Sequence, residues 1–130
     1  MMKMNFFKSF KYAFSGTIKA FLTGRNFRIM LVCFVLVVAF GFLFNVSAME
    51  WIVLIICSGM VLSLELLNTA IEKTIDLIVS DYNKTAGNVK DIAAGAVLIA
   101  SIFSAIIALI IFIPYIINIP DCLGRAYVMV

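Results

Sequence analysis

The chain has 130 residues, of which 65% are hydrophobic and only 13% are charged, against about 25% charged residues in a typical soluble domain. Its mean hydropathy is +1.16 and its formal net charge is +3. A soluble monomer of this size exposes too much of its surface to hide so many apolar side chains. The composition therefore excludes an ordinary soluble domain, a disordered chain and a nucleic-acid-binding protein. Because the sequence has no histidine, it also excludes histidine-based catalysis and histidine metal sites.

The segment of about residues 5–24 predicts an amphipathic surface helix in the membrane interface, because its apolar residues fall within roughly half of a helical wheel. Lys8, Ser15 and Lys19 fall on the opposite side. A targeting presequence or a plain anchor is the alternative. The apolar residues are Phe6, Phe7, Phe10, Ala13, Phe14, Ile18, Phe21 and Leu22.

Three apolar runs then predict three transmembrane helices, so that residues 1–130 form one all-α integral membrane domain. Each run is long enough to cross a hydrocarbon core of about 30 Å as a helix. The first and third runs carry no charge, and the second carries Glu65 deep within it. We expect Pro114 to end the last helix near Ile113, ahead of a tail at 115–130. The predicted spans are about residues 29–48, 51–72 and 92–113.

Basic residues are unevenly distributed around these spans. Six of the ten precede the first span, three lie in the predicted loop 73–91, and none lies between the first two spans. By the positive-inside rule, the N-terminus and the 73–91 loop face the cytoplasm. The first six are Lys3, Lys8, Lys11, Lys19, Arg25 and Arg28, and the next three are Lys73, Lys84 and Lys90.

A polar stripe on the second span is formed by Glu65, Asn68, Glu72 and Asp76. Their spacing places them within an arc of about 80° on one helix face, over about 16 Å of helix. An unpaired charge in lipid costs about 2.5–3.5 kcal/mol on insertion scales, so Glu65 indicates a functional site. The structural alternative is that these acids pair with basic side chains and hold helices together. Those basic side chains would be Lys73, Lys90 or Arg28.

Like charges at this spacing repel one another, and a divalent cation with bound phosphate relieves that repulsion. Mg²⁺ prefers oxygen ligands and usually takes one or two carboxylates together with phosphates. A carboxylate deeper on the stripe can accept a proton from an alcohol whose tail lies in lipid. The stripe therefore predicts a place where a phosphate donor from water meets a lipid alcohol.

The sequence has no phosphate-binding loop of the soluble kinases, so a nucleotide would be held by short loops and helix ends. The segments 80–84 and 88–91 are the candidates. Lys90 can neutralise phosphate charge. We expect Asp91 at the N-cap of the third span, where a helix cap and a nucleotide contact both suit a carboxylate.

Two blocks of the sequence resemble the prokaryotic diacylglycerol kinase family, which comprises small trimeric integral-membrane lipid kinases with a surface helix and three spans. The first block is ELLNTAIEKTID at residues 65–76, and the second is NVKDIAAGAV at residues 88–97. The resemblance covers roughly Phe10 to Pro114. The second block, together with RNFR at residues 25–28, looks most like the undecaprenol kinases of Gram-positive bacteria.

The resemblance implies ATP-dependent, Mg²⁺-dependent phosphorylation of a lipid alcohol in the bacterial cytoplasmic membrane, by a homotrimer whose active sites are shared between subunits. Undecaprenol is the favoured substrate, and a diacylglycerol kinase that makes phosphatidic acid is the alternative. The resemblance also implies that Glu65 is the general base on the lipid hydroxyl, that Asn68 is catalytic, and that Glu72 binds the metal. Implied nucleotide contacts are Tyr12, Glu72, Asp76, Asp81, Tyr82, Asn83, Lys90 and Asp91. Implied lipid contacts are Phe14, Asn26, Phe27, Arg28, Glu65 and Ala94.

One position departs from the family pattern. Family members commonly carry a metal-binding glutamate directly before the RNFR motif, where this chain has Thr23 and Gly24. The usual histidine after the motif is Met30, and no acidic residue occurs before Glu50. Either water, Asp81 or a neighbouring subunit completes the metal coordination, or metal binding is weaker.

Two functions of other classes stay open. A non-catalytic membrane scaffold that senses lipid is compatible with the departure at Gly24. An ion or proton pathway would use Glu65 and Glu72, but the first and third spans offer no charged partner within the membrane.

We predict that the Gly24→Glu substitution raises the affinity for Mg²⁺, because the new carboxylate adds a second hard oxygen ligand. A Mg²⁺ titration of phosphate transfer measures the effect. An unchanged titration in the variant would count against the idea.

Overall fold

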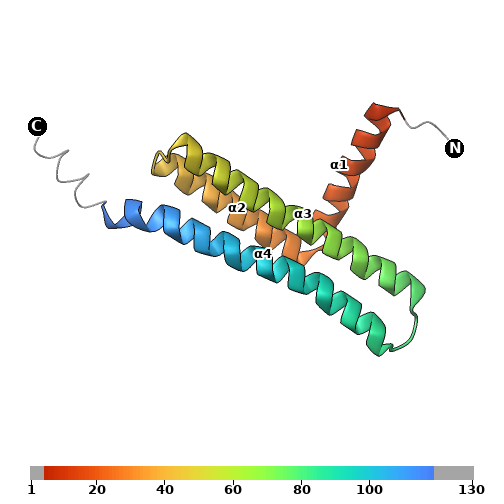
Figure 1. Cartoon of the computed structure of the whole chain (residues 1–130). Coiled ribbons are helices and arrows are strands. Elements are labelled where there is room, and N and C mark those ends of the chain that lie inside the picture. Colours follow the sequence, from red (N-terminus) through yellow and green to blue (C-terminus); the bar gives the residue numbers. More distant parts are fainter. Residues whose placement is uncertain (1–4, 119–130) are drawn as a thin grey trace, which may run out of the picture.

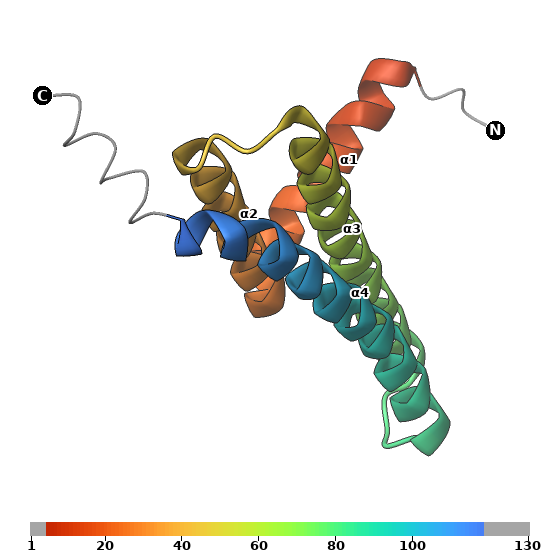
Figure 2. The same cartoon turned by 60° about the vertical axis from the view of Figure 1, so that its left-hand side comes forward.

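The computed structural model describes residues 5–118, which form four helices joined by short connections (Figure 1). Of the predicted tail, only residues 115–118 fall in this part, and Lys3 lies outside it. α3 packs against both α2 and α4, and α1 projects away from them where α2 begins (Figure 1, Figure 2). The helices are α1 (Phe6–Thr23), α2 (Arg25–Leu43), α3 (Ala48–Ile78) and α4 (Lys84–Ile117).

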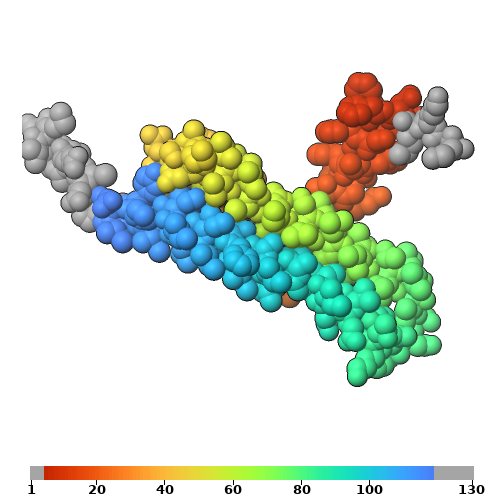
Figure 3. All heavy atoms as spheres, viewed as in Figure 1, coloured from red at the N-terminus to blue at the C-terminus, as the bar shows by residue number. Residues whose placement is uncertain are grey.

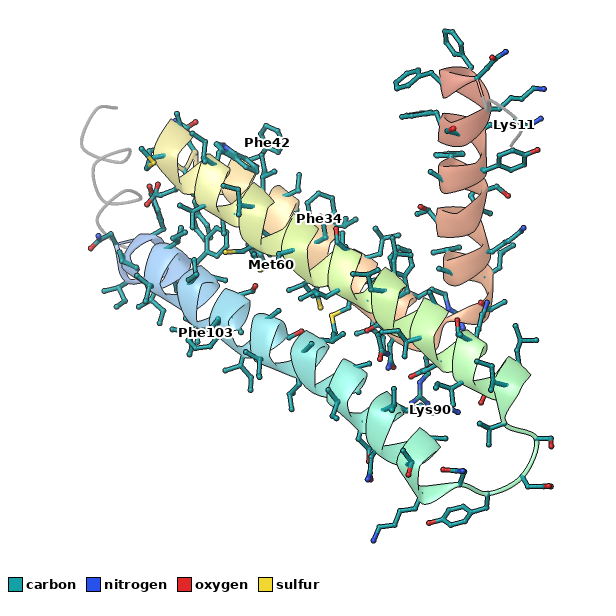
Figure 4. All side chains as sticks on the ribbon, turned by 45° about the vertical axis from the view of Figure 1, so that its right-hand side comes forward. Lys11, Phe34, Phe42, Met60, Lys90 and Phe103 are labelled. Atoms are coloured by element: carbon teal, nitrogen blue, oxygen red, sulfur yellow. The ribbon has the colours of Figure 1, made fainter. Side chains whose placement is uncertain are left out.

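α2, α3 and α4 are each long and apolar enough to cross a membrane, so the predicted all-α fold with three candidate spans is confirmed. Most of their large apolar side chains lie on the outside of the bundle. On the face drawn in Figure 3, α3 and α4 form most of the bundle surface. Phe103 of α4, for example, points outward from the bundle and is 63% exposed (Figure 4). Such surfaces are stable against lipid, because every backbone group within a helix already has a hydrogen-bond partner.

The helices extend beyond the predicted spans at several ends. α2 begins at Arg25, four residues before the predicted span of 29–48, but it ends at Leu43, five residues short of the predicted end. α3 continues to Ile78 and α4 already begins at Lys84, so the connection between them is much shorter than the predicted 73–91 loop. Hydropathy marks the part of a helix that suits hydrocarbon, and polar residues continue the same backbone beyond it. The 31 residues of α3 span about 46 Å, more than the apolar layer alone requires.

Two predictions about helix ends are wrong. Asp91 is not the N-cap of α4 but lies within the helix, because the Asn83 side chain caps it by accepting a hydrogen bond from the backbone N–H of Ala86 at 3.0 Å. Pro114 does not end α4, which continues to Ile117. Proline removes one backbone donor but its fixed φ suits a helix, and only one short turn follows it here.

The break between α1 and α2 is a single residue, Gly24, in an extended conformation. Its backbone N–H donates to the carbonyl oxygen of Ala20 at 2.7 Å. A Cβ atom at Gly24 would lie 2.7 Å from that same oxygen, so a side chain here requires a local shift of the α1 end. This close approach turns α1 away from the bundle and brings its C-terminus beside α3.

The opposite end of the bundle is fixed by hydrogen bonds and aromatic packing. Ser47 and Glu50 form a reciprocal capping box at the start of α3. The Tyr115 hydroxyl donates to the Glu50 carboxylate at 2.7 Å and so ties α4 to the α2–α3 turn. Next to these groups Val46, Leu54 and Phe112 form a buried cluster. Val37, Phe44, Trp51, Ala108 and Ile111 pack against it.

We predict that Gly41→Ala destabilises the bundle by about 1–3 kcal/mol, because the new methyl group would lie 2.5 Å from the Trp51 ring. Gly59→Ala is the matched control, since a Cβ there meets no atom within 4 Å. A denaturant titration of each variant in mixed micelles measures the free energy of unfolding. Equal stability of the two variants would show that the ring moves aside without cost.

Candidate active site

The polar stripe of α3 begins inside the bundle and ends on its surface. Glu65 and Asn68 are 4% and 5% exposed, whereas Glu72 and Asp76 are exposed. The Asn68 amide nitrogen donates to the Glu72 carboxylate at 3.2 Å. The Asn68 side-chain oxygen is buried and has no protein partner. One face of α3 therefore carries a buried carboxylate and two exposed ones. The Asn68 amide contacts one of the exposed carboxylates, and its side-chain oxygen can still accept a hydrogen bond.

Glu65, Glu72 and Asp76 of this stripe line an open cleft of about 370 Å³, whereas Asn68 does not belong to its lining. Three helices form it: the end of α1, the start of α2 and the polar half of α3. Asn26, one of the predicted lipid contacts, shares the cleft with three acids of the stripe. The lining residues are Thr23, Gly24, Arg25, Asn26, Glu65, Thr69, Glu72, Lys73 and Asp76.

Two lysines approach the acidic face from different sides. Lys90 of α4 points to α3 and forms an ion pair with the Asp76 carboxylate (Figure 4). Lys73 of α3 instead donates to the Thr23 hydroxyl at the end of α1, at 3.2 Å. The expected pairing of the acids with basic side chains is therefore found within residues 5–118 for Asp76 alone.

Several predicted site residues lie elsewhere in the chain. Phe27 is buried and does not belong to the cleft lining, whereas Arg28 lines a separate shallow groove on α2. Tyr12 and Phe14 are exposed on α1 and do not belong to the cleft lining. The remaining predicted residues lie on or near α4, where all five are exposed: Asp81, Tyr82, Asn83, Asp91 and Ala94.

Four lining residues were not among the predicted site residues: Thr23, Arg25, Thr69 and Lys73. For Thr69 and Lys73 a signal was present, because they follow Glu65 by four and eight residues and so share its face of the helix. For Thr23 no comparable signal exists, since its position beside α3 depends on how α1 packs.

A divalent cation fits this cleft only together with further ligands. Within residues 5–118 no group of three or more acidic or cysteine side chains could hold a metal ion by itself. Glu65 and Glu72 nevertheless offer carboxylates to the same cleft. Mg²⁺ commonly accepts one or two carboxylates when phosphate oxygens and water complete its coordination. The donor set thus suits a metal that arrives with phosphate.

Comparison with known proteins gives a consistent result. A family model described as "Prokaryotic diacylglycerol kinase" matches residues 11–112. The chain is 44% identical over 109 residues to the undecaprenol kinase of Bacillus subtilis, covering 84% of this chain and 89% of that protein. It is 42% identical over 111 residues to a diacylglycerol kinase of Synechocystis sp., covering 85% of this chain and 63% of that protein. It is 34% identical over 99 residues to the diacylglycerol kinase of Escherichia coli, covering 76% of this chain and 81% of that protein.

We predict that the Lys90–Asp76 pair contributes little to folding. Both side chains are partly exposed, and exposed ion pairs typically contribute less than about 1 kcal/mol. Lys90→Met and Asp76→Asn should therefore each change the free energy of unfolding by less than about 1 kcal/mol in a denaturant titration. A loss of several kcal/mol in both variants would instead favour the alternative that the acids serve to hold helices together.

Proposed function

This chain belongs to the prokaryotic diacylglycerol kinase family and is a lipid kinase, and we propose that it transfers a phosphoryl group from ATP to undecaprenol in a bacterial cytoplasmic membrane. The observation that carries the proposal is the cleft in which Glu65, Glu72 and Asp76 meet. It lies between helices that can cross a membrane, so a lipid alcohol and a water-soluble donor can reach it from different sides. The similarity to the Bacillus subtilis undecaprenol kinase supports undecaprenol as the acceptor.

In the proposed reaction the lipid hydroxyl oxygen attacks the γ-phosphorus of ATP. The new oxygen–phosphorus bond forms as the bond to the β,γ-bridging oxygen breaks, and ADP leaves. Glu65, the deepest carboxylate of the cleft, takes the hydroxyl proton as general base. Asn68 fixes the Glu72 carboxylate through its amide and has a free oxygen that can accept a hydrogen bond.

Mg²⁺ would be held by Glu72 together with nucleotide phosphates, and would neutralise negative charge on the transferred group. Asp76 lies one helical turn beyond Glu72 on α3 and lines the cleft. Lys90 lies across from it on α4 and forms an ion pair with it. We assign the nucleotide to this end. The loop residues Asp81, Tyr82 and Asn83, with Asp91 and Tyr12, would contribute the other nucleotide contacts.

The chain is proposed to act as a homotrimer with active sites shared between subunits. Phe14 and Ala94, two proposed lipid contacts, are exposed and lie outside the cleft of their own chain, as does Arg28. In a trimer such side chains can complete the site of a neighbour, next to Asn26 and the supporting ring of Phe27. A protomer whose cleft is open on one side suits such sharing.

We further propose that α1 is an amphipathic helix in the cytoplasmic interface, with the N-terminus and the α3–α4 connection in the cytoplasm. Phe6, Phe7 and Phe10 are 79%, 85% and 68% exposed, which suits insertion among lipid headgroups. Lys11 is carried on the part of α1 that projects from the bundle (Figure 4). The excess of basic residues before α2 supports this orientation.

A diacylglycerol kinase is the second candidate, because relatives in Synechocystis and Escherichia coli carry that activity in their names.

The third candidate is a non-catalytic scaffold, and Gly24 is the residue that bears on it. It lines the same cleft as Glu72, so a glutamate added there would face the proposed metal position once the α1 end shifts. Gly24→Ala separates the cost of that shift from the effect of the carboxylate.

We predict that the purified protein transfers radiolabelled phosphate from ATP to undecaprenol faster than to diacylglycerol, and only with Mg²⁺. Glu65→Gln should lower kcat at least about 100-fold, because general base catalysis contributes that much or more. Glu50→Gln is the matched control, since Glu50 lies at the far end of α3 and glutamine still accepts its hydrogen bonds.

Far faster turnover of short-chain diacylglycerol than of polyprenols would replace undecaprenol by diacylglycerol as the substrate. No transfer to any lipid alcohol by the wild-type chain would favour the scaffold. Equal activity of the Glu65 and Glu50 variants would remove Glu65 as the base.

A further inference from the structure

Lys73 has a fixed position in the wall of the cleft, directly after Glu72 in the chain. Its ammonium group donates to the Thr23 hydroxyl oxygen at 3.2 Å, and that hydroxyl in turn donates to the carbonyl oxygen of Lys19 at 2.8 Å. The Thr23 hydroxyl is thus used as acceptor and donor at once. The contact holds the charge of Lys73 at the junction of α1 and α3.

No carboxylate neutralises this charge in the described part of the chain. Within residues 5–118 the ion pair found below 4 Å joins Lys90 to Asp76, although Lys73 lines the cleft together with three acids. An ammonium has three donors, and Thr23 takes one of those of Lys73. Two donors remain for an oxygen-rich anion that enters the cleft.

The charges of the cleft are divided between its walls. Glu65 and Glu72 lie along α3, whereas the α1–α2 junction has no acidic side chain and carries Arg25. Gly24 at this junction has no side chain, and the carbonyl oxygen of Ala20 lies 2.7 Å from the position that a Cβ would take. A phosphate group in the cleft would therefore meet carboxylates, which need a metal, on one side and cations on the other. Lys73 is the cation that a hydrogen bond holds in place.

We infer that Lys73 is a phosphate-binding residue of this cleft. The inference rests on the proposed kinase function and adds a residue that the predicted site did not include. A compact ammonium group with free donors binds phosphate oxygens well, as a point charge. Its hydroxyl partner Thr23 would position it.

Two sources of phosphate are compatible with the geometry, because Lys73 borders two hollows. One is the polar cleft that Glu72 shares, where the phosphates of ATP would lie. The other is a groove of about 350 Å³ between α1 and α3, with Lys19 and Lys73 beside small apolar residues, which suits the phosphate of a lipid product. The binding chemistry is the same in both, and the test separates them.

The test measures equilibrium binding to the full chain in neutral detergent, with Mg²⁺ present. One arm titrates ATP in the absence of any lipid alcohol, and the other titrates undecaprenyl phosphate in mixed micelles. The variants are Lys73→Gln, which removes the charge but keeps a polar end group, and Lys73→Arg, which keeps the charge. Lys8→Gln is the matched control, since Lys8 is exposed on α1 and lies outside both hollows.

We expect Lys73→Gln to weaken ATP binding about tenfold, Lys73→Arg to stay within about twofold of the wild type, and Lys8→Gln to have no effect. Weaker binding of undecaprenyl phosphate alone would support the inference with the lipid as the phosphate source. If Lys73→Gln changes neither affinity while the wild type still phosphorylates lipid, the inference is overturned and the proposed function stands. If the wild type neither binds ATP nor transfers phosphate, both are overturned.

Discussion

A carboxylic acid and an amide buried in an apolar helix bundle require polar surroundings, because water cannot solvate them and lipid does not. Glu65 and Asn68 impose this requirement at the middle of α3. The structure meets it by breaking the chain at Gly24, so that the polar start of α2 lies against the same face of α3. The cleft is a consequence of that arrangement. The break also turns α1 away from the bundle. Of the acids in the cleft, Glu72 and Asp76 are exposed.

The two ends of α3 have different physical characters. At the α2–α3 turn, Ser47, Glu50 and Tyr115 form hydrogen bonds, and the aromatic rings of Phe44 and Phe112 pack closely. At the other end the side chains are exposed and the connections are short. A rigid helix anchored at one end places groups at its other end reproducibly, which phosphoryl transfer needs because positioning supplies most of its catalysis. Membership of a lipid kinase family agrees with this division.

The electrostatics of the cleft depend on few charges, each with a definite position. Asp76 is balanced by Lys90 from α4, whereas Glu65 and Glu72 have no basic partner within 4 Å in the described part of the chain. Lys73 is held by a hydroxyl instead of an acid. The cleft therefore offers carboxylate oxygens and an ammonium group side by side.

The sequence by itself determined the features that lie within a single helix. The spacing of Glu65, Asn68, Glu72 and Asp76 predicted a single polar face, because the 3.6-residue period fixes angles within a helix. Apolar runs predicted the three candidate spans for a similar reason. Contacts between helices were not predictable: which of Lys73, Lys90 and Arg28 pairs with an acid of the stripe, and the position of Lys73 beside Thr23. Those contacts depend on how α1 and α4 pack against α3, and packing joins residues whose distance along the chain carries no periodic signal.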